Sequence, residues 1–389
     1  MSSEAVEQKK PLTRFGEIEL LKAIAILGLP AVHVMEEAIE GGFASDGLIS
    51  FGSAIIGLCA FGPSVFMICM GFGIGGGRTK PDGIFRNGVQ FLLIGALLNI
   101  FRWFIPGIIQ SIVIDKNIID DLEFCLQSDI YYFVGIFYIF LSLIRRLKIQ
   151  TPGLIMVSIL MLTANMLLTP LTNQYITNPI VASLVGNIVY VNETSCFPLL
   201  SWAIFPSVGI LLGEVLKKAD EDQRENFMKR TMDFSAVLFV SFMSFLWIYG
   251  VDLTKVLVSP ANDYITDLPN VVLLLSLALF LISITYYWCK RIGASKFMAF
   301  MLRISTFIIP FYLLQWIIIA WIFYILEICR VEEGGFGVIL YVISVIVVTL
   351  ICIYLTIKHG MKTMKGLLKI TSFGGKKKKK KKKKAEKTV

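Results

Sequence analysis

The first long apolar stretch of the chain, residues 20–37, reads LLKAIAILGLPAVHVMEE. It is long enough for a transmembrane helix, because the hydrocarbon core of a bilayer takes about 20 residues of helix. It also contains His33, one of only two histidines in the protein. An ionisable side chain inside such a span costs several kcal/mol unless it has a partner, a water-filled cavity or a function. The stretch therefore indicates both a membrane protein and a polar site within it.

The composition of the whole chain is that of a polytopic membrane protein. Of its 389 residues, 56% are hydrophobic and 17% are charged, and the mean hydropathy is +0.74. The apolar residues fall in long continuous blocks without the alternation of a β-barrel strand, which predicts an all-α transmembrane helical bundle. We expect about ten spans, near residues 19–36, 53–74, 87–105, 129–145, 153–171, 197–216, 233–250, 269–288, 304–326 and 336–357.

The basic residues predict the orientation of these spans. With ten spans and a cytoplasmic N-terminus, 32 of the 37 Lys and Arg residues lie in cytoplasmic segments, and only two, Lys22 and Arg102, lie within spans. Cytoplasmic loops of membrane proteins carry such an excess of positive charge. We therefore expect a cytoplasmic N-terminal segment at 1–18, a ten-helix membrane domain at 19–357 and a cytoplasmic tail at 358–389.

The formal net charge of +9 comes mostly from this tail, in which residues 376–384 are nine consecutive lysines. Such a run repels itself and is expected to be disordered. Next to a bilayer each lysine can gain about 1 kcal/mol from anionic lipid. We therefore expect anionic lipids, and no nucleic acid, as the partner of the tail.

Four ionisable residues share one face of the first expected helix. Lys22 and His33 are eleven residues apart, which is almost three turns and about 16 Å along the axis. Glu36 and Glu37 return to that face at i+3 and i+4 from His33. A carboxylate beside an imidazole orients it and stabilises its charged form, as a general base requires. Asp129, at the outer start of the fourth span, is a third candidate for this carboxylate.

Other polar residues fall into an inner and an outer group. Arg78 and Arg86 follow the glycine-rich end of the second span, where they can bind a phosphate-bearing donor or simply obey the positive-inside rule. Asn99 and Arg102 lie in the outer half of the third span, and Gln315 lies mid-span in the ninth. They can line a polar cavity or lock helices together. Arg102 can pair with Asp129, Glu36 or Glu37. The cysteines lack metal-ligand spacing, and no metal is expected.

Several segments resemble the membrane acyltransferases of the acyltransferase-three superfamily. The segment from Lys22 to His33 is similar to the first-helix signature of an arginine, ten intervening residues and a histidine. FMICMGFGI at 66–74 is similar to the second-helix segment, and residues 305–315 to a late-helix motif. Residues 86–99, 197–202 and 209–213 look closer to the heparan-glucosaminide acetyltransferase-like branch. Lys22 stands where the family has arginine, Met70 where it has serine, and Gln315 where many relatives have histidine.

The resemblance implies an enzyme that moves an acyl group, usually acetyl, from cytoplasmic acetyl-CoA to a hydroxyl or amine of an extracytoplasmic glycan or envelope polymer. His33 would deprotonate the acceptor or carry the acyl group itself. Acetyl-CoA would be a co-substrate, with no permanently bound cofactor. The inner cations, namely Lys22, Arg78 and Arg86, would face the donor. A bacterial plasma membrane is the expected location.

Two other classes of function fit the same residues. Charges inside the membrane, such as Lys22, Arg102 and Asp129, can form the pathway of a transporter or flippase for a lipid-linked or anionic solute. The chain shows no internal repeat, which gives that alternative no support from symmetry. A non-enzymatic membrane sensor or scaffold is the third class. We favour the acyltransferase.

Overall fold

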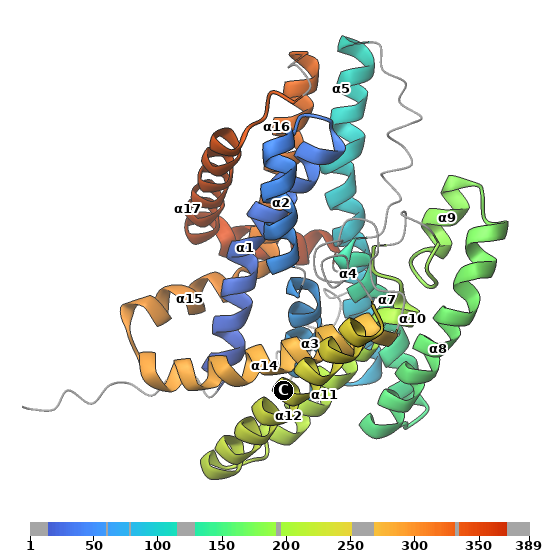
Figure 1. Cartoon of the computed structure of the whole chain (residues 1–389), viewed down its shortest axis with the longest axis vertical. Helices are drawn as coiled ribbons and strands as arrows, with labels where there is room; N and C mark the ends of the chain where they lie inside the picture. Colours follow the sequence, from blue (N-terminus) through green and yellow to red (C-terminus); the bar gives the residue numbers. More distant parts are fainter. Residues whose placement is uncertain are drawn as a thin grey trace, which may run out of the picture.

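The structure is a computed structural model that describes residues 15–59, 61–77, 79–114, 129–191, 196–250, 268–330 and 334–371 (Figure 1). These residues form helices and their connections, with one isolated bridge between Ala44 and Phe336. The helices are α1 (Gly16–Glu40), α2 (Asp46–Cys59), α3 (Gly62–Ile74), α4 (Pro81–Asn99), the π-helix η1 (Ile100–Phe104), α5 (Ile105–Val113), α7 (Ile130–Arg146), α8 (Thr151–Tyr175), α9 (Pro179–Val185), α10 (Leu199–Trp202), α11 (Ile204–Leu216), α12 (Glu221–Ile248), α14 (Leu268–Ile292), α15 (Lys296–Thr306), α16 (Ile308–Ile328) and α17 (Val338–Thr371).

Eight segments of the described chain are long and apolar enough to cross a membrane. The all-α membrane fold is therefore confirmed, but two of the ten expected spans are not among the eight. The expected second span is divided into α2 and the 13-residue α3. Pro63 lies in the first turn of α3, and a proline ring clashes with the helical turn that would precede it. The fourth expected span is α7, which has only 17 residues. The eight segments are Gly16–Glu40, Pro81–Val113, Thr151–Tyr175, Leu199–Leu216, Glu221–Ile248, Leu268–Ile292, Ile308–Ile328 and Val338–Lys369.

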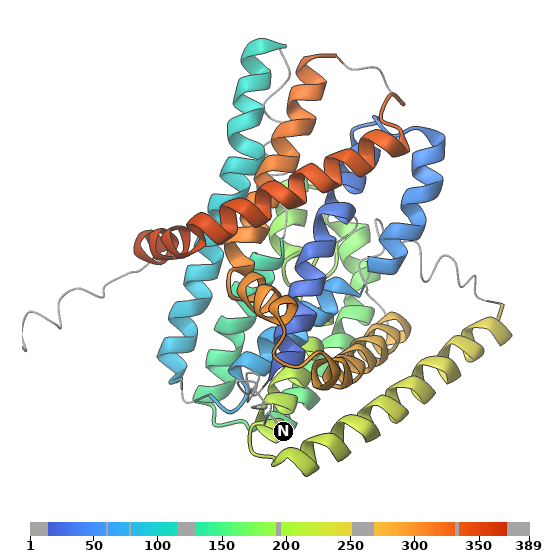
Figure 2. The same cartoon turned by 90° about the vertical axis from the view of Figure 1, so that its left-hand side faces the viewer.

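Helix α1 lies in the middle of the molecule and belongs to both hydrophobic cores. Ile18 and Leu21 pack into the core that also holds buried residues of α3, α7, α11 and α14. Leu20 and Ile26 pack into the second core, with residues of α15, α16 and α17. Figure 2 shows α17 crossing α1 and α16 obliquely. Because α1 contacts helices of both cores, a polar side chain on it lies among several helices.

The outer helices present apolar side chains to the surroundings. On α8, Leu167 is 71% exposed, and on α12 Trp247 is 72% exposed. A soluble protein rarely shows such continuous apolar surface. These faces are what a helix bundle presents to lipid chains, which are as apolar as leucine.

Glycines bring α3 and α11 into backbone contact. A Cβ atom added to Gly71 or Gly75 would clash with the carbonyl oxygen of Pro206 or Ile210. The reverse also holds, because a Cβ on Gly209 would meet the carbonyl oxygen of Ile68. Each helix thus carries a small-xxx-small pattern, the arrangement that lets membrane helices approach closely. The glycines at the end of the second expected span therefore pack these two helices together.

We predict that Gly71→Ala lowers stability by about 1–3 kcal/mol, because the added methyl overpacks this contact. Gly73→Ala is the matched control, since Gly73 lies on the same helix and a Cβ there meets nothing within 4 Å. Thermal unfolding of the two variants in the same detergent checks the prediction. Equal melting midpoints would contradict the close α3–α11 contact.

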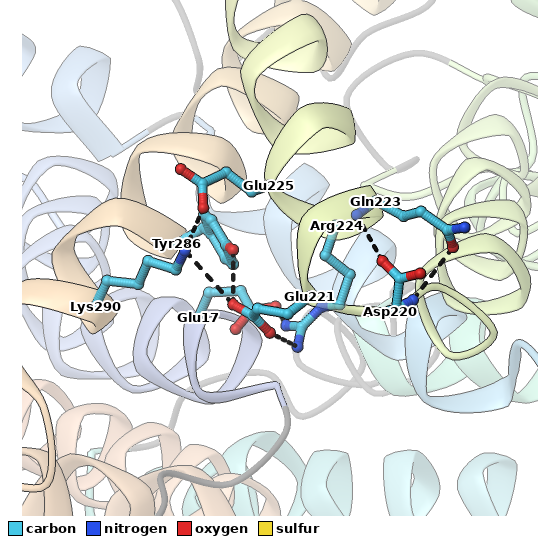
Figure 3. A network of polar contacts seen from close by, with 8 residues as sticks. All are labelled: Glu17, Asp220, Glu221, Gln223, Arg224, Glu225, Tyr286 and Lys290. Carbon is cyan, nitrogen blue, oxygen red and sulfur yellow. Dashed lines mark hydrogen bonds and ion pairs between the residues drawn. The ribbon is translucent and has the colours of Figure 1, made fainter.

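A charged network joins the start of α1 to α12 and α14 (Figure 3). Arg224 of α12 donates to Glu17 of α1 at 2.9 Å, and both side chains are buried. Arg224 also pairs with Glu221 at 3.3 Å, and Glu221 accepts a hydrogen bond from the Tyr286 hydroxyl of α14 at 3.0 Å. Removing one partner of a buried pair leaves an uncompensated charge, which costs about 3–5 kcal/mol. The network therefore attaches α12 to the bundle although most of this helix is exposed. It also includes the ion pair of Lys290 with Glu225 and the capping box of Asp220 with Gln223.

Candidate functional site

His33 is buried in α1 against one face of α16. Its ring stacks on the ring of Trp316, with centroids 3.8 Å apart and planes 21° apart. Its Nδ1 lies 3.3 Å from Nε2 of Gln315, and the ring of Tyr312 packs edge-on at 6.0 Å. These three residues of α16 follow the i, i+3, i+4 spacing of one helix face. A single surface of α16 therefore fixes the position of the imidazole.

Arg102 reaches this site from a widened helical turn. It lies in η1, where the N–H of Ile105 bonds the carbonyl of Ile100, five residues back. Pro106 has no N–H with which to bond the carbonyl of Arg102, and its ring disfavours ordinary α-helical geometry there. The guanidinium carbon lies 4.3 Å from the Trp316 ring centroid. Such π turns occur often at functional sites.

Asp129, at the start of α7, pairs with Arg102 and completes the cluster. Its carboxylate accepts a hydrogen bond from Arg102 Nη1 at 3.3 Å and from the Tyr312 hydroxyl at 3.2 Å, and both side chains of the ion pair are 4% exposed. It also caps α7 by accepting from the backbone N–H of Tyr131. Of the three carboxylates that the sequence offered to Arg102, the structure pairs it with Asp129. The pair touches the same aromatic residues as His33.

Glu36 and Glu37 lie one turn beyond His33 and are half-buried. Arg102 is within electrostatic range of both glutamates and of His33. The described contacts of the His33 ring are to Gln315, Trp316 and Tyr312 and not to a carboxylate. The site thus contains one imidazole, one guanidinium and three carboxyl groups, with an amide where a carboxylate partner of His33 was expected.

Cys196 lies near the same charges, in the connection before α10. It is within electrostatic range of Asp129, Arg102 and Glu36. Burial raises the pKa of this thiol to about 12. Only a thiolate is a strong nucleophile, so His33 is better suited than Cys196 to attack or to move a proton here.

The donor-side candidates lie apart from this cluster. Lys22 lies on α1, eleven residues before His33. It pairs with Glu19 at 2.9 Å, and Glu19 accepts a hydrogen bond from Ser305 of α15. Arg86 is exposed on α4. Arg78 lies outside the described residues.

Asn99 is buried at the end of α4, directly before η1. In the described parts of the chain, no group of three or more His, Cys, Asp or Glu side chains could hold a metal ion.

Comparison with protein families assigns the chain to a family. A family model described as an acyltransferase domain, acyltransferase 3, matches residues 15–358. The chain belongs to the acyltransferase-3 family. No curated protein and no solved structure matches it. This acyltransferase-3 protein is thus a membrane acyltransferase, and the matched range includes α1, α16 and every residue of the His33 site.

Tyr312 is a member of the His33 cluster that the sequence did not single out. It contacts His33 and also donates to Asp129, so it joins the two halves of the site. The one clue in the sequence was the position of Tyr312, three residues before Gln315 and within the late-helix motif at 305–315. A tyrosine in an apolar helix gives no other sign of its role, because aromatic residues are common throughout these spans.

We predict that Arg102→Leu and Asp129→Leu each lower stability by about 3–5 kcal/mol, because each leaves a buried charge without its partner. The double variant should lose less than the sum of the two. Thermal unfolding of the four proteins, analysed as a double-mutant cycle, checks this. Strictly additive losses would mean that the two side chains do not interact.

Proposed function

We propose that this acyltransferase moves an acyl group, most simply acetyl, from cytoplasmic acyl-CoA to a hydroxyl or amine of an extracytoplasmic glycan or envelope polymer. The observation that carries the proposal is the burial of His33 between α1 and α16 beside the Arg102–Asp129 pair. A buried imidazole next to a guanidinium and an amide offers a base, a charge for a developing oxyanion and a hydrogen-bonding group within one site.

Two buried polar atoms support substrate binding at this position. Gln315 Oε1 and Arg102 Nε have no hydrogen-bond partner among the described residues. Such atoms are uncommon in folded proteins and call for an explanation. A second, non-reacting hydroxyl of the acceptor glycan can donate to Gln315 Oε1, so that the reacting hydroxyl can donate its proton to His33. The N–H of Arg102 can donate to the carbonyl oxygen of the donor thioester.

The proposed reaction balances in two steps. His33 takes the proton of the acceptor hydroxyl while the hydroxyl oxygen bonds to the thioester carbonyl carbon. The carbon–sulfur bond then breaks, and the CoA thiolate takes the proton back from the imidazolium. In the alternative route one ring nitrogen of His33 displaces CoA, and the departing thiolate takes the proton of the other ring nitrogen. The acyl-imidazole then passes its acyl group to the acceptor hydroxyl, whose proton returns to the ring. Both routes use acyl-CoA as co-substrate and no permanently bound cofactor.

The proposed placement in the membrane follows the charge distribution. We propose ten spans, with α2 and α3 together as the second and α7 as the fourth, both chain ends in the cytoplasm and the His33 end of α1 toward the outside. Lys22, Arg78 and Arg86 would then face the CoA phosphates from the inner side. The lysine tail would lie against anionic lipids. This arrangement suits a bacterial plasma membrane, where the donor is inside and the envelope polymer outside.

We predict that purified wild-type protein in lipid transfers label from radioactive acetyl-CoA to an envelope glycan extract, and that His33→Ala abolishes the transfer. The matched control is His359→Ala, which replaces the other histidine at an exposed position of α17. Label on the wild-type protein itself, absent in His33→Ala, would assign the acyl-carrier route. Full transfer by His33→Ala would exclude both routes.

We predict that a cysteine replacing Glu40, exposed at the end of α1, reacts with an impermeant thiol reagent on intact cells. A cysteine replacing Lys229, exposed on α12, should react only after the membrane is opened. Wild-type protein gives the background of the native cysteines. The reverse pattern would invert the proposed orientation.

A further inference from the structure

A groove lies between α15 and α17 and shares no residue with the surroundings of His33. It has a volume of about 770 Å³. Its chemistry is mixed, since it combines apolar side chains with two cations and a tyrosine. The lining residues are Arg303 of α15 and Leu350, Ile353, Tyr354, Ile357 and Lys358 of α17.

The apolar and charged parts of the groove are separated along α17. Leu350, Ile353 and Ile357 follow the i, i+3, i+7 spacing of one helix face. Lys358 comes directly after Ile357, and Arg303 donates to the carbonyl of Ile357 at 3.2 Å. The two positive charges therefore lie at the same end, and the apolar face extends from them for two turns.

Neither cation forms an ion pair within the part of the chain that the structure describes. Arg303 bonds a backbone carbonyl, and Lys358 donates to the Tyr354 hydroxyl at 2.7 Å, so both partners are neutral. A guanidinium has five N–H donors and an ammonium three. Both side chains therefore keep unused N–H donors and a positive charge that can bind an anion. Charge-assisted hydrogen bonds to a phosphate are stronger than hydrogen bonds between neutral groups.

We propose that this groove binds one anionic phospholipid, with its phosphate between Arg303 and Lys358 and an acyl chain along Leu350, Ile353 and Ile357. Helix α17 is one of the segments that can cross a membrane, and its apolar face is open, with Leu350 60% exposed. A lipid supplies both the anion and the chain that the two parts of the groove match. A free phosphate would use only the charged end, and a zwitterionic lipid would bring its own cation toward two others.

Bound lipid would also hold α15 against α1. Ser305, two residues after Arg303, donates to Glu19, which pairs with Lys22. A lipid that binds Arg303 and α17 together therefore stabilises the inner half of α1. This inference concerns lipid binding alone and stands independently of the acyl-transfer reaction.

The test titrates full-length protein in detergent with phosphatidylglycerol and follows the rise of the unfolding midpoint, because a ligand that binds the folded state stabilises it. The variant is Arg303→Gln with Lys358→Gln. The matched control is Arg230→Gln with Lys229→Gln, which removes the same two charges from exposed positions of α12. The lysine tail is present in all three proteins. Phosphatidylcholine and inorganic phosphate are titrated in parallel.

We expect the groove variant to bind phosphatidylglycerol about 25-fold more weakly, at roughly fivefold per lost charge, and the control variant to match the wild type. Phosphatidylcholine and inorganic phosphate should give no shift at the same concentrations. Equal weakening in both variants would assign the effect to net charge, and no weakening in either would assign it to the tail. If inorganic phosphate raised the unfolding midpoint as much as the lipid does, the groove would be a simple anion site that does not bind a lipid chain. Each of these outcomes overturns the proposal.

Discussion

The structure depends on the need to satisfy charged groups that lie among apolar helices. Arg102 and Asp129 are nearly inaccessible, and neither can remain charged there without the other. Their pairing fixes η1 against the start of α7, and Tyr312 and Trp316 then attach α16 to the pair. His33 lies on the same two aromatic rings. One ion pair therefore determines how three helices meet around the imidazole.

Close backbone contact is the second constraint, and it acts at the opposite end of α1. The glycines of α3 and α11 remove the side chains that would hold these helices apart. Lys217, just after α11, donates to the carbonyls of Phe72 and Gly73 at the end of α3. A cation at a helix C-terminus satisfies carbonyls that have no partner within the helix. The same region was expected to bind the donor phosphates, and its packing now accounts for the glycines without a ligand.

The sequence predicted the helical class and the outer polar residues because hydropathy and helical spacing are local properties. The sequence also contains Pro63, which explains why the second span divides into two helices. The apolar block around Pro63 is continuous, so hydropathy alone predicted one unbroken span. The choice of Asp129 over Glu36 or Glu37 as the partner of Arg102 depends on how α7 packs against η1, which no spacing within α1 can reveal. The Glu17–Arg224 pair joins residues 207 positions apart and has no periodic signal.

The amide of Gln315 has one further consequence. A carboxylate beside the ring would accept a hydrogen bond from the N–H at Nδ1 and so fix one tautomer of His33. A carboxamide can turn over and exchange its donor and acceptor ends, and it can then bond Nδ1 with or without its proton. The imidazole is therefore held in place without being committed to one protonation pattern. A ring held in this way can give up a proton at one nitrogen and take one up at the other while its position stays fixed.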